Sequence, residues 1–260
     1  MKKATLLLVL GLLLTSVGSA PEQVDTFKSG EWFKFRVHYG VFNACYATLQ
    51  VNETTLNGKE VFHVKGHGES AGMLDWFFKV DDTYESYFMK DKVKPVRFIR
   101  KINEGGHKKD IQIDFDYKTK KALVHNKKYD KKQDVTIPKN AQDMVSAFYY
   151  MRDEVDAATI QPGDEFILPM FMDEDTHQFK LKFLKREIID TEFGKMRALK
   201  FRPYVMSGRV FKEEESLTVW VSDDKNKMPL RIKADIAVGS IKADLEAFKG
   251  LKHPFTIVVD

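Results

Sequence analysis

The order of turn and strand residues in the first half of the chain recurs in the second half, and this internal repeat constrains the fold more than any other feature. Five landmarks come in one order at similar spacing in both halves. In the first half they are Ser29-Gly30-Glu31, Gly58-Lys59, Glu85-Ser86, Pro95-Val96-Arg97-Phe98, and Gly106 followed by Asp110. In the second half they are Pro162-Gly163-Asp164, Gly194-Lys195, Glu215-Ser216, Pro229-Leu230-Arg231-Ile232, and Gly239 followed by Asp244. The recurrence predicts two copies of one supersecondary unit, about 29–117 and 162–249, within a single β-rich domain of residues 21–260.

Apolar and polar residues alternate through both copies. In the stretch 31–39, Phe33, Phe35 and Val37 fall on one face of an extended chain, and Lys34 and Arg36 fall on the other. Such a strand has one wet face and one dry face, which is typical of an antiparallel sheet covered on a single side. The same pattern recurs at 45–51, 111–117, 179–183, 217–221, 230–236 and 241–247.

Short turns between these stretches indicate meander connections. Asn57-Gly58 is a strong two-residue hairpin signal. We count six strands per copy and two more around Leu123 and Val135. The fold class predicted is mainly β, with antiparallel meander sheets that bury their dry faces as a barrel, a half-barrel or two packed sheets. The dry faces of the two copies are expected to share one concavity.

Two stretches break the alternation. Between the copies, Asn140 is expected to cap a helix over about 140–157, whose apolar residues fall at helical spacing from Met144 to Val155. This helix is the natural plug or lid of the shared concavity. The stretch 70–78 packs several apolar residues into a short run, which suits a helical turn or a loop folded over the sheet.

The first twenty residues have the composition of a secretory signal peptide. Lys2 and Lys3 precede an apolar stretch, and Gly18-Ser19-Ala20 offers a small-residue cleavage site. The alternative is an uncleaved anchor, but the apolar stretch is shorter than the roughly 20 residues of a spanning helix. We therefore predict an exported, periplasmic protein with no transmembrane segment after cleavage. Its one cysteine, Cys45, cannot form an internal disulfide, so the core alone must hold the fold.

The charge pattern argues against a nucleic-acid partner. Without Lys2 and Lys3, 40 basic residues stand against 38 acidic ones, and the two signs are interleaved. Such a pattern is typical of a solvated surface rather than a nucleic-acid footprint. The densest basic run, 118–132, reads best as a soluble hairpin with charged edges, and the alternative is a site for a polyanion or a lipid headgroup.

Three segments of the chain resemble a known family. They are Gly30-Glu31 with the strand that follows it, the helical run from Asp143 to Arg152, and Val219-Trp220-Val221-Ser222-Asp223-Asp224. In these the chain is similar to the exported bacterial family catalogued as domain of unknown function 3108. The resemblance implies a periplasmic or envelope-associated protein rich in antiparallel β-structure, and it brings no catalytic residues with it.

Signatures of catalysis and of cofactor binding are missing from the sequence. It has no nucleophile elbow, no phosphate-binding loop, no zinc-binding HExxH motif and no paired cysteines, so no cofactor and no metal are expected. His63 and His67 would lie about 13 Å apart on one strand, too far to share a metal. The acidic clusters at 81–82, 173–175 and 223–224 read as turn residues rather than as a catalytic pair.

An excess of large apolar residues remains, with 20 Phe and 10 Met. Met beside aromatic residues gives the adaptable lining of hydrophobic binding sites. We predict a non-catalytic protein that binds a lipid or an acylated protein between the sheet and the helix, lined by Trp76, Phe77, Phe148 and Met172. The alternatives are an envelope interaction module with a solid core, which docks partner proteins through its sheet edges or basic hairpin, and a hydrolase of a cell-wall or surface polymer.

Overall fold

The computed structural model describes residues 24–72, 74–206 and 217–258, so the predicted signal peptide and the landmark Glu215-Ser216 lie outside the described residues. Within the described part, fourteen strands form one antiparallel sheet, and two helices interrupt the chain. The first meander is β1 (Trp32–Tyr39), β2 (Phe42–Leu56), β3 (Lys59–Ser70), β4 (Asp81–Met89), β5 (Pro95–Glu104), β6 (His107–Asp116), β7 (Lys121–Asn126) and β8 (Lys131–Thr136), with α1 (Leu74–Phe77) between β3 and β4. After α2 (Met144–Glu154), the second meander is β9 (Glu165–Met172), β10 (Asp175–Thr191), β11 (Gly194–Met206), β12 (Leu217–Ser222), β13 (Pro229–Asp235) and β14 (Ser240–Lys249).

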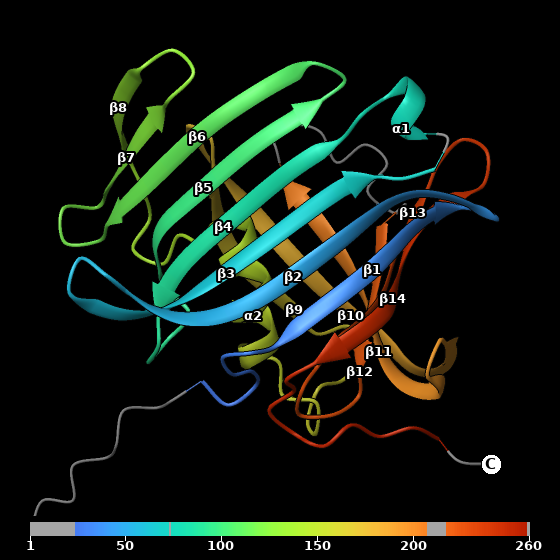
Figure 1. Ribbon diagram of the computed structural model, residues 1–260. Helices are drawn as coiled ribbons and strands as arrows, with labels where there is room; N and C mark the ends of the chain where they lie inside the picture. Colours follow the sequence, from blue (N-terminus) through green and yellow to red (C-terminus); the bar gives the residue numbers. More distant parts are fainter. Residues whose placement is uncertain (1–23, 73, 207–216, 259–260) are drawn as a thin grey trace, which may run out of the picture.

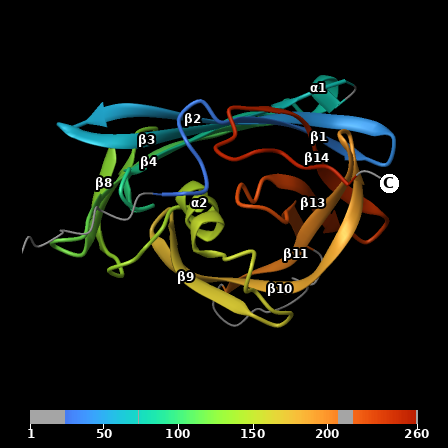
Figure 2. The same cartoon turned by 90° about the horizontal axis from the view of Figure 1, so that it is seen from below.

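Within each meander, every strand pairs with its neighbours in sequence, and β1 pairs with β14 to join the two meanders. The edges of the sheet are therefore β8 and β9, the strands on either side of α2 in the sequence. The sheet curls around α2, which lies inside the curve (Figures 1 and 2). The predicted fold class, an antiparallel meander forming a half-barrel around an inter-repeat helix, is confirmed, and the sheet is not closed.

Turn landmarks of the two halves occupy equivalent places. Gly58 immediately precedes β3 and Gly194 begins β11, and each of these is the third strand of its meander. Gly106 and Gly239 immediately precede β6 and β14, the sixth strand of each meander. All four glycines have positive φ, between 74° and 106°, a backbone conformation that residues with a Cβ adopt at a cost. Because the turns demand glycine, they explain why these residues recur in the sequence. Descent of the two halves from one unit stays an interpretation.

The predicted start of the helix is wrong. Asn140 does not cap it, because the chain first runs along β9: Gln142 N donates to Pro169 O at 2.9 Å, and Phe171 N donates to Gln142 O at 2.7 Å. Asp143 is the N-cap, and α2 ends at Glu154 rather than near 157. The pairing with β9 delays the helix by a turn and also covers part of that sheet edge.

The core consists of apolar clusters, two of which contain buried residues of α2. One side of α2 packs Tyr149 against Phe27 and Phe88, with ring centroids 4.7 and 5.8 Å apart. The other side packs Ala147 and Met151 against β9. Fully burying one large apolar side chain contributes about 1.5–3 kcal/mol, so packing on both halves stabilises α2 far more than its helix propensity does. The helix is thereby wedged between the two meanders.

Candidate functional site

The last turn of α2 carries a buried ion pair. Arg152 donates from Nη1 and Nη2 to the two carboxylate oxygens of Glu31, at 2.7 and 2.9 Å. The two side chains are 2% and 0% exposed. Burial alone would lower the pKa of Arg152, but Glu31 more than reverses this and raises it. Four aromatic rings with centroids 5.2 to 5.8 Å from the guanidinium carbon surround the cation: Phe27, Phe33, Phe148 and Tyr149.

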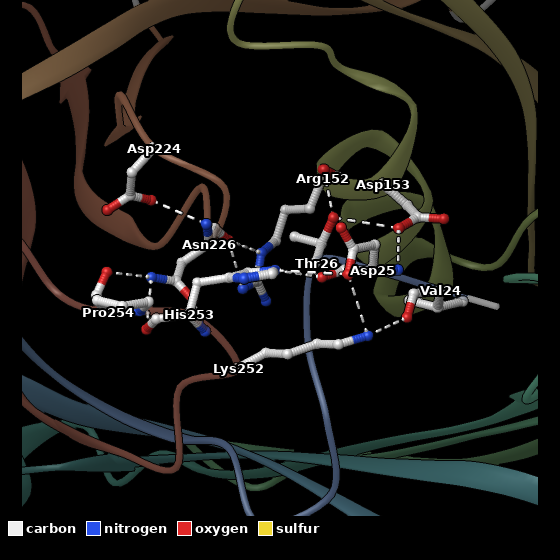
Figure 3. Close-up of polar contacts among 10 residues, drawn as sticks. All are labelled: Val24, Asp25, Thr26, Arg152, Asp153, Asp224, Asn226, Lys252, His253 and Pro254. Atoms are coloured by element: carbon white, nitrogen blue, oxygen red, sulfur yellow. Dashed lines mark hydrogen bonds and ion pairs between the residues drawn. The ribbon is translucent and has the colours of Figure 1, made fainter.

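Both terminal segments of the described chain converge on this end of α2 (Figure 3). Arg152 Nη2 also donates to Asn226 O at 2.8 Å. The backbone N–H of His253 donates in turn to Asn226 Oδ1 at 2.9 Å. From the N-terminal side, Thr26 Oγ1 donates to Arg152 O at 3.1 Å, and Lys252 Nζ donates to Val24 O at 2.5 Å. This network, the Arg152 clasp, ties residues 24–26 and 252–254 to the helix.

The first turn of α2 is anchored by Asp143. Its carboxylate accepts hydrogen bonds from Val145 N at 2.9 Å, from Ser146 N at 2.8 Å and from Ser86 Oγ at 2.7 Å. Burial raises the pKa of Asp143 to about 6, although these hydrogen bonds lower it. The helix is therefore fixed at both ends by buried polar contacts, to β4 at its start and to the residue preceding β1 at its end.

An apolar cavity of about 140 Å³ lies between α2 and strands β9 to β12. Of its fourteen lining residues only Arg152 and Lys227 are charged, and Lys227 Nζ donates to Val155 O at 2.6 Å. Burial lowers the pKa of Lys227. Because Glu31 and Val155 engage these two charges, the cavity offers an apolar wall rather than a polar site. The apolar lining comprises Met144, Ala147, Phe148, Met151, Val155, Met170, Phe179, Leu181, Phe201, Pro203, Val219 and Val221.

The structure does not bring the four predicted lining residues together. Phe148 lines the cavity. Met172 ends β9, and its neighbour on the same strand, Met170, lines the cavity in its place. Trp76 and Phe77 lie in α1 at the outer end of β3 and β4 and are exposed to solvent. The missed lining residues carried two signals, helical spacing in α2 and alternation in β9 to β12, but no local pattern shows that these two faces meet.

One acidic residue of each predicted turn cluster has a structural partner, and His63 Nε2 lies 2.8 Å from Glu85 Oε2. Asp82 accepts from Asn103 N at 2.9 Å, Asp173 pairs with Arg100 at 3.1 Å, and Asp224 accepts from Asn226 N at 2.9 Å. Within the described ranges, no group of three or more His, Cys, Asp or Glu could hold a metal ion. Burial raises the pKa of Cys45, so this thiol is not activated as a thiolate.

The basic run folds as the expected hairpin of β7 and β8. Lys127, Lys131 and Lys132 are exposed there, and His125 Nε2 lies 2.9 Å from Asp130. Charged side chains on an edge strand oppose pairing with another sheet. No helix in the described ranges is long and apolar enough to cross a membrane.

Comparison with known proteins agrees with this architecture. A beta-barrel-like protein of the domain of unknown function DUF1849 from Brucella abortus is similar over 87% of this chain and 99% of its own, with a TM-score of 0.55 and 9% identity, which shows the fold alone. A Bacteroides fragilis protein with a YmcC-like fold aligns over 88% of this chain and 99% of its own at 9% identity, with a TM-score of only 0.35. The family model DUF3108, a protein of unknown function, matches residues 34–246, so the chain belongs to that family. No curated protein matches it.

Proposed function

We propose that this protein is exported to the periplasm or envelope and binds there, without catalysis, the apolar end of an amphiphilic molecule such as a lipid or an acylated protein. The site is the cavity between α2 and β9 to β12. The observation that carries the proposal is the lining: twelve of fourteen residues are apolar, and the two charges are already engaged. The beta-barrel-like fold suits a ligand-binding or interaction module.

Cavity size limits what enters. A dry apolar cavity of about 150 Å³ takes up a molecule the size of benzene, whereas pockets that engulf a drug-sized ligand run to roughly 300–1,000 Å³. At about 140 Å³, this cavity holds the end of one acyl chain or a single ring and not a whole lipid. Each buried methylene contributes about 0.8 kcal/mol, so an end of four methylenes would gain roughly 3 kcal/mol. Met144 is the one exposed residue of the lining, at 39%. It marks the end of the cavity at which the acyl chain of the ligand enters.

The test uses the cavity methionines as reporters. Met144, Met151 and Met170 line the cavity, so their methyl groups, labelled with ¹³C, should shift when decanoate is titrated below its micelle concentration. The variant Val219→Phe places a ring in the cavity from β12 and should weaken decanoate binding at least about tenfold, because the ring occupies the volume the chain end needs. Ile188 of β10, which is 56% exposed and outside the lining, gives the matched control: Ile188→Phe adds a ring away from the cavity and should leave binding unchanged.

Two results would count against the proposal. One is methionine methyl signals that do not move at saturating decanoate. The other is equal affinity in Val219→Phe and the parent. Native mass spectrometry of the protein isolated from the envelope should in addition reveal a copurified amphiphile.

A further inference from the structure

The cavity beside α2 follows the whole length of the helix. Its helical lining residues recur at i, i+3 and i+4 spacing and so form one stripe on one side of α2. They are Met144, Ala147, Phe148, Met151, Arg152 and the C-cap Val155. At a rise of about 1.5 Å per residue, this stripe is roughly 16 Å long. The helix therefore presents a long wall to the cavity.

The sheet side of the lining has the same elongated form. Leu181 of β10 lies opposite Pro203 of β11. Two residues before Pro203, Phe201 lies opposite Val219 of β12, so the lining passes from strand to strand as a diagonal row. Met170 continues the row on β9. At about 4.8 Å from one strand to the next, a row across four strands spans at least about 14 Å. Two long rows, one on the helix and one on the sheet, therefore enclose a channel.

The two ends of this channel differ. At the start of α2, Met144 is exposed, whereas Val221 at the other end is 7% exposed. Arg152 and Lys227 lie at that buried end, and each is already bonded within the protein. A ligand that pushed further in would have to separate Arg152 from Glu31, which would leave a buried charge without its partner. The channel therefore opens at Met144 and stops at Arg152 and Lys227.

Length and volume together decide between a ring and a chain. A compact apolar cavity of about 150 Å³ takes up benzene. Here about 140 Å³ is drawn out along the helix, so the channel is narrower than a ring, whereas an extended chain of methylenes touches both walls. We propose that the cavity accepts one unbranched acyl chain, methyl end first, and limits the length of chain that it buries. This inference rests on the proposed function and adds the shape and length of the ligand.

Calorimetric titration with two carboxylates of different shape tests the width. Decanoate and 4-cyclohexylbutanoate have the same number of carbon atoms, but a ring forms the leading end of the second. Both are titrated below their micelle concentrations. Decanoate should bind at least about tenfold more tightly, because a ring held at the mouth loses the burial of at least two methylenes, each worth about fourfold in affinity.

A series of unbranched carboxylates from butanoate to tetradecanoate tests the closed end. Affinity for the parent protein should rise about fourfold per methylene until the methyl end reaches Arg152. Beyond that length it should rise less than about twofold per methylene, because the added methylenes stay in water at the mouth. Val221→Ala removes volume at the closed end and should move this break to a longer chain. Val64→Ala, at a buried valine of β3 outside the lining, should not move it.

The results separate this inference from the proposed function. If none of the carboxylates binds, the proposed function itself is wrong. If decanoate binds but 4-cyclohexylbutanoate binds equally well, or if affinity rises without a break through tetradecanoate, the site stands and the one-chain channel is overturned. A break that stays in place in a folded Val221→Ala variant, checked by circular dichroism, would overturn the assignment of the closed end.

Discussion

Removing the charge of Glu31 should destabilise the whole molecule. The variant Glu31→Gln keeps the shape of the side chain but leaves the Arg152 guanidinium, which is 2% exposed, without a counter-charge. In the parent protein, the Glu31 carboxylate accepts two charge-assisted hydrogen bonds from Arg152, at 2.7 and 2.9 Å. Breaking one partner of a buried ion pair costs about 3–5 kcal/mol, because the remaining charge cannot return to water. We expect a loss of about 3 kcal/mol, at the low end of that range, because the amide oxygen of the introduced glutamine still accepts one hydrogen bond.

Urea unfolding followed by circular dichroism measures this loss. Asp114→Asn is the matched control, since Arg97 and Asp114 form an ion pair whose side chains are 26% and 32% exposed. That change should cost less than about 1 kcal/mol. A cost below about 1 kcal/mol for Glu31→Gln as well would refute the view that the Arg152 clasp holds α2 in place.

A double-mutant cycle separates the pair from its surroundings. Glu31→Leu and Arg152→Met each leave one buried partner behind, whereas the double variant leaves neither charge. The double variant should therefore cost less than the sum of the two single variants by at least about 2 kcal/mol. Some cost should remain, since Asn226 O loses the donor that now lies 2.8 Å away.

Two further changes test the N-cap of α2 and the close approach of Gly250 to Gly30. The pKa of Asp143 is raised from 3.8 to about 6, so its protonated form favours the folded state and the associated stability is lost as pH rises from about 4 to 6. Asp143→Asn should remove this dependence. As the pH rises from 4 to 6, the free energy of unfolding of the variant should therefore increase relative to that of the parent, by up to about 3 kcal/mol in urea titrations. Gly250→Ala places a methyl group against the Gly30 carbonyl at φ +72°, whereas Gly163, at φ +100°, has open space around it. Thermal unfolding should show a larger loss for Gly250→Ala than for Gly163→Ala, which bears only the backbone strain of roughly 1–2 kcal/mol.

Strands were predictable because their signal is local. Alternation fixes which side of a strand is buried, and the Asn57-Gly58 pair, with φ of 52° and 74°, forms the hairpin that its sequence indicates. The start of α2 was not predictable, because Gln142 pairs with β9, some 28 residues further along the chain at Met170. Helix propensity and capping rules describe a segment alone, and a strand edge elsewhere in the chain decided where this helix begins.

The candidate site was less accessible to sequence reasoning than the fold. Phe148 lines the cavity because it shares a helical stripe with Met144 and Met151. Trp76 and Phe77 form an equally dense apolar cluster, but density along the sequence cannot distinguish a core segment from a projecting turn. Glu31 and Arg152 stood in segments already noted for their resemblance to the family, yet their contact spans 121 residues and follows only from the curl of the sheet.

The segments that resemble the family meet at the helix rather than at a reactive centre. Glu31 holds the end of α2, Asp143 holds its start, and Asp224 shapes the turn that presents Asn226 O to Arg152. Buried polar contacts of this kind fix position more than they add stability. With both ends of α2 fixed, the width of the cavity is set by the side chains between them.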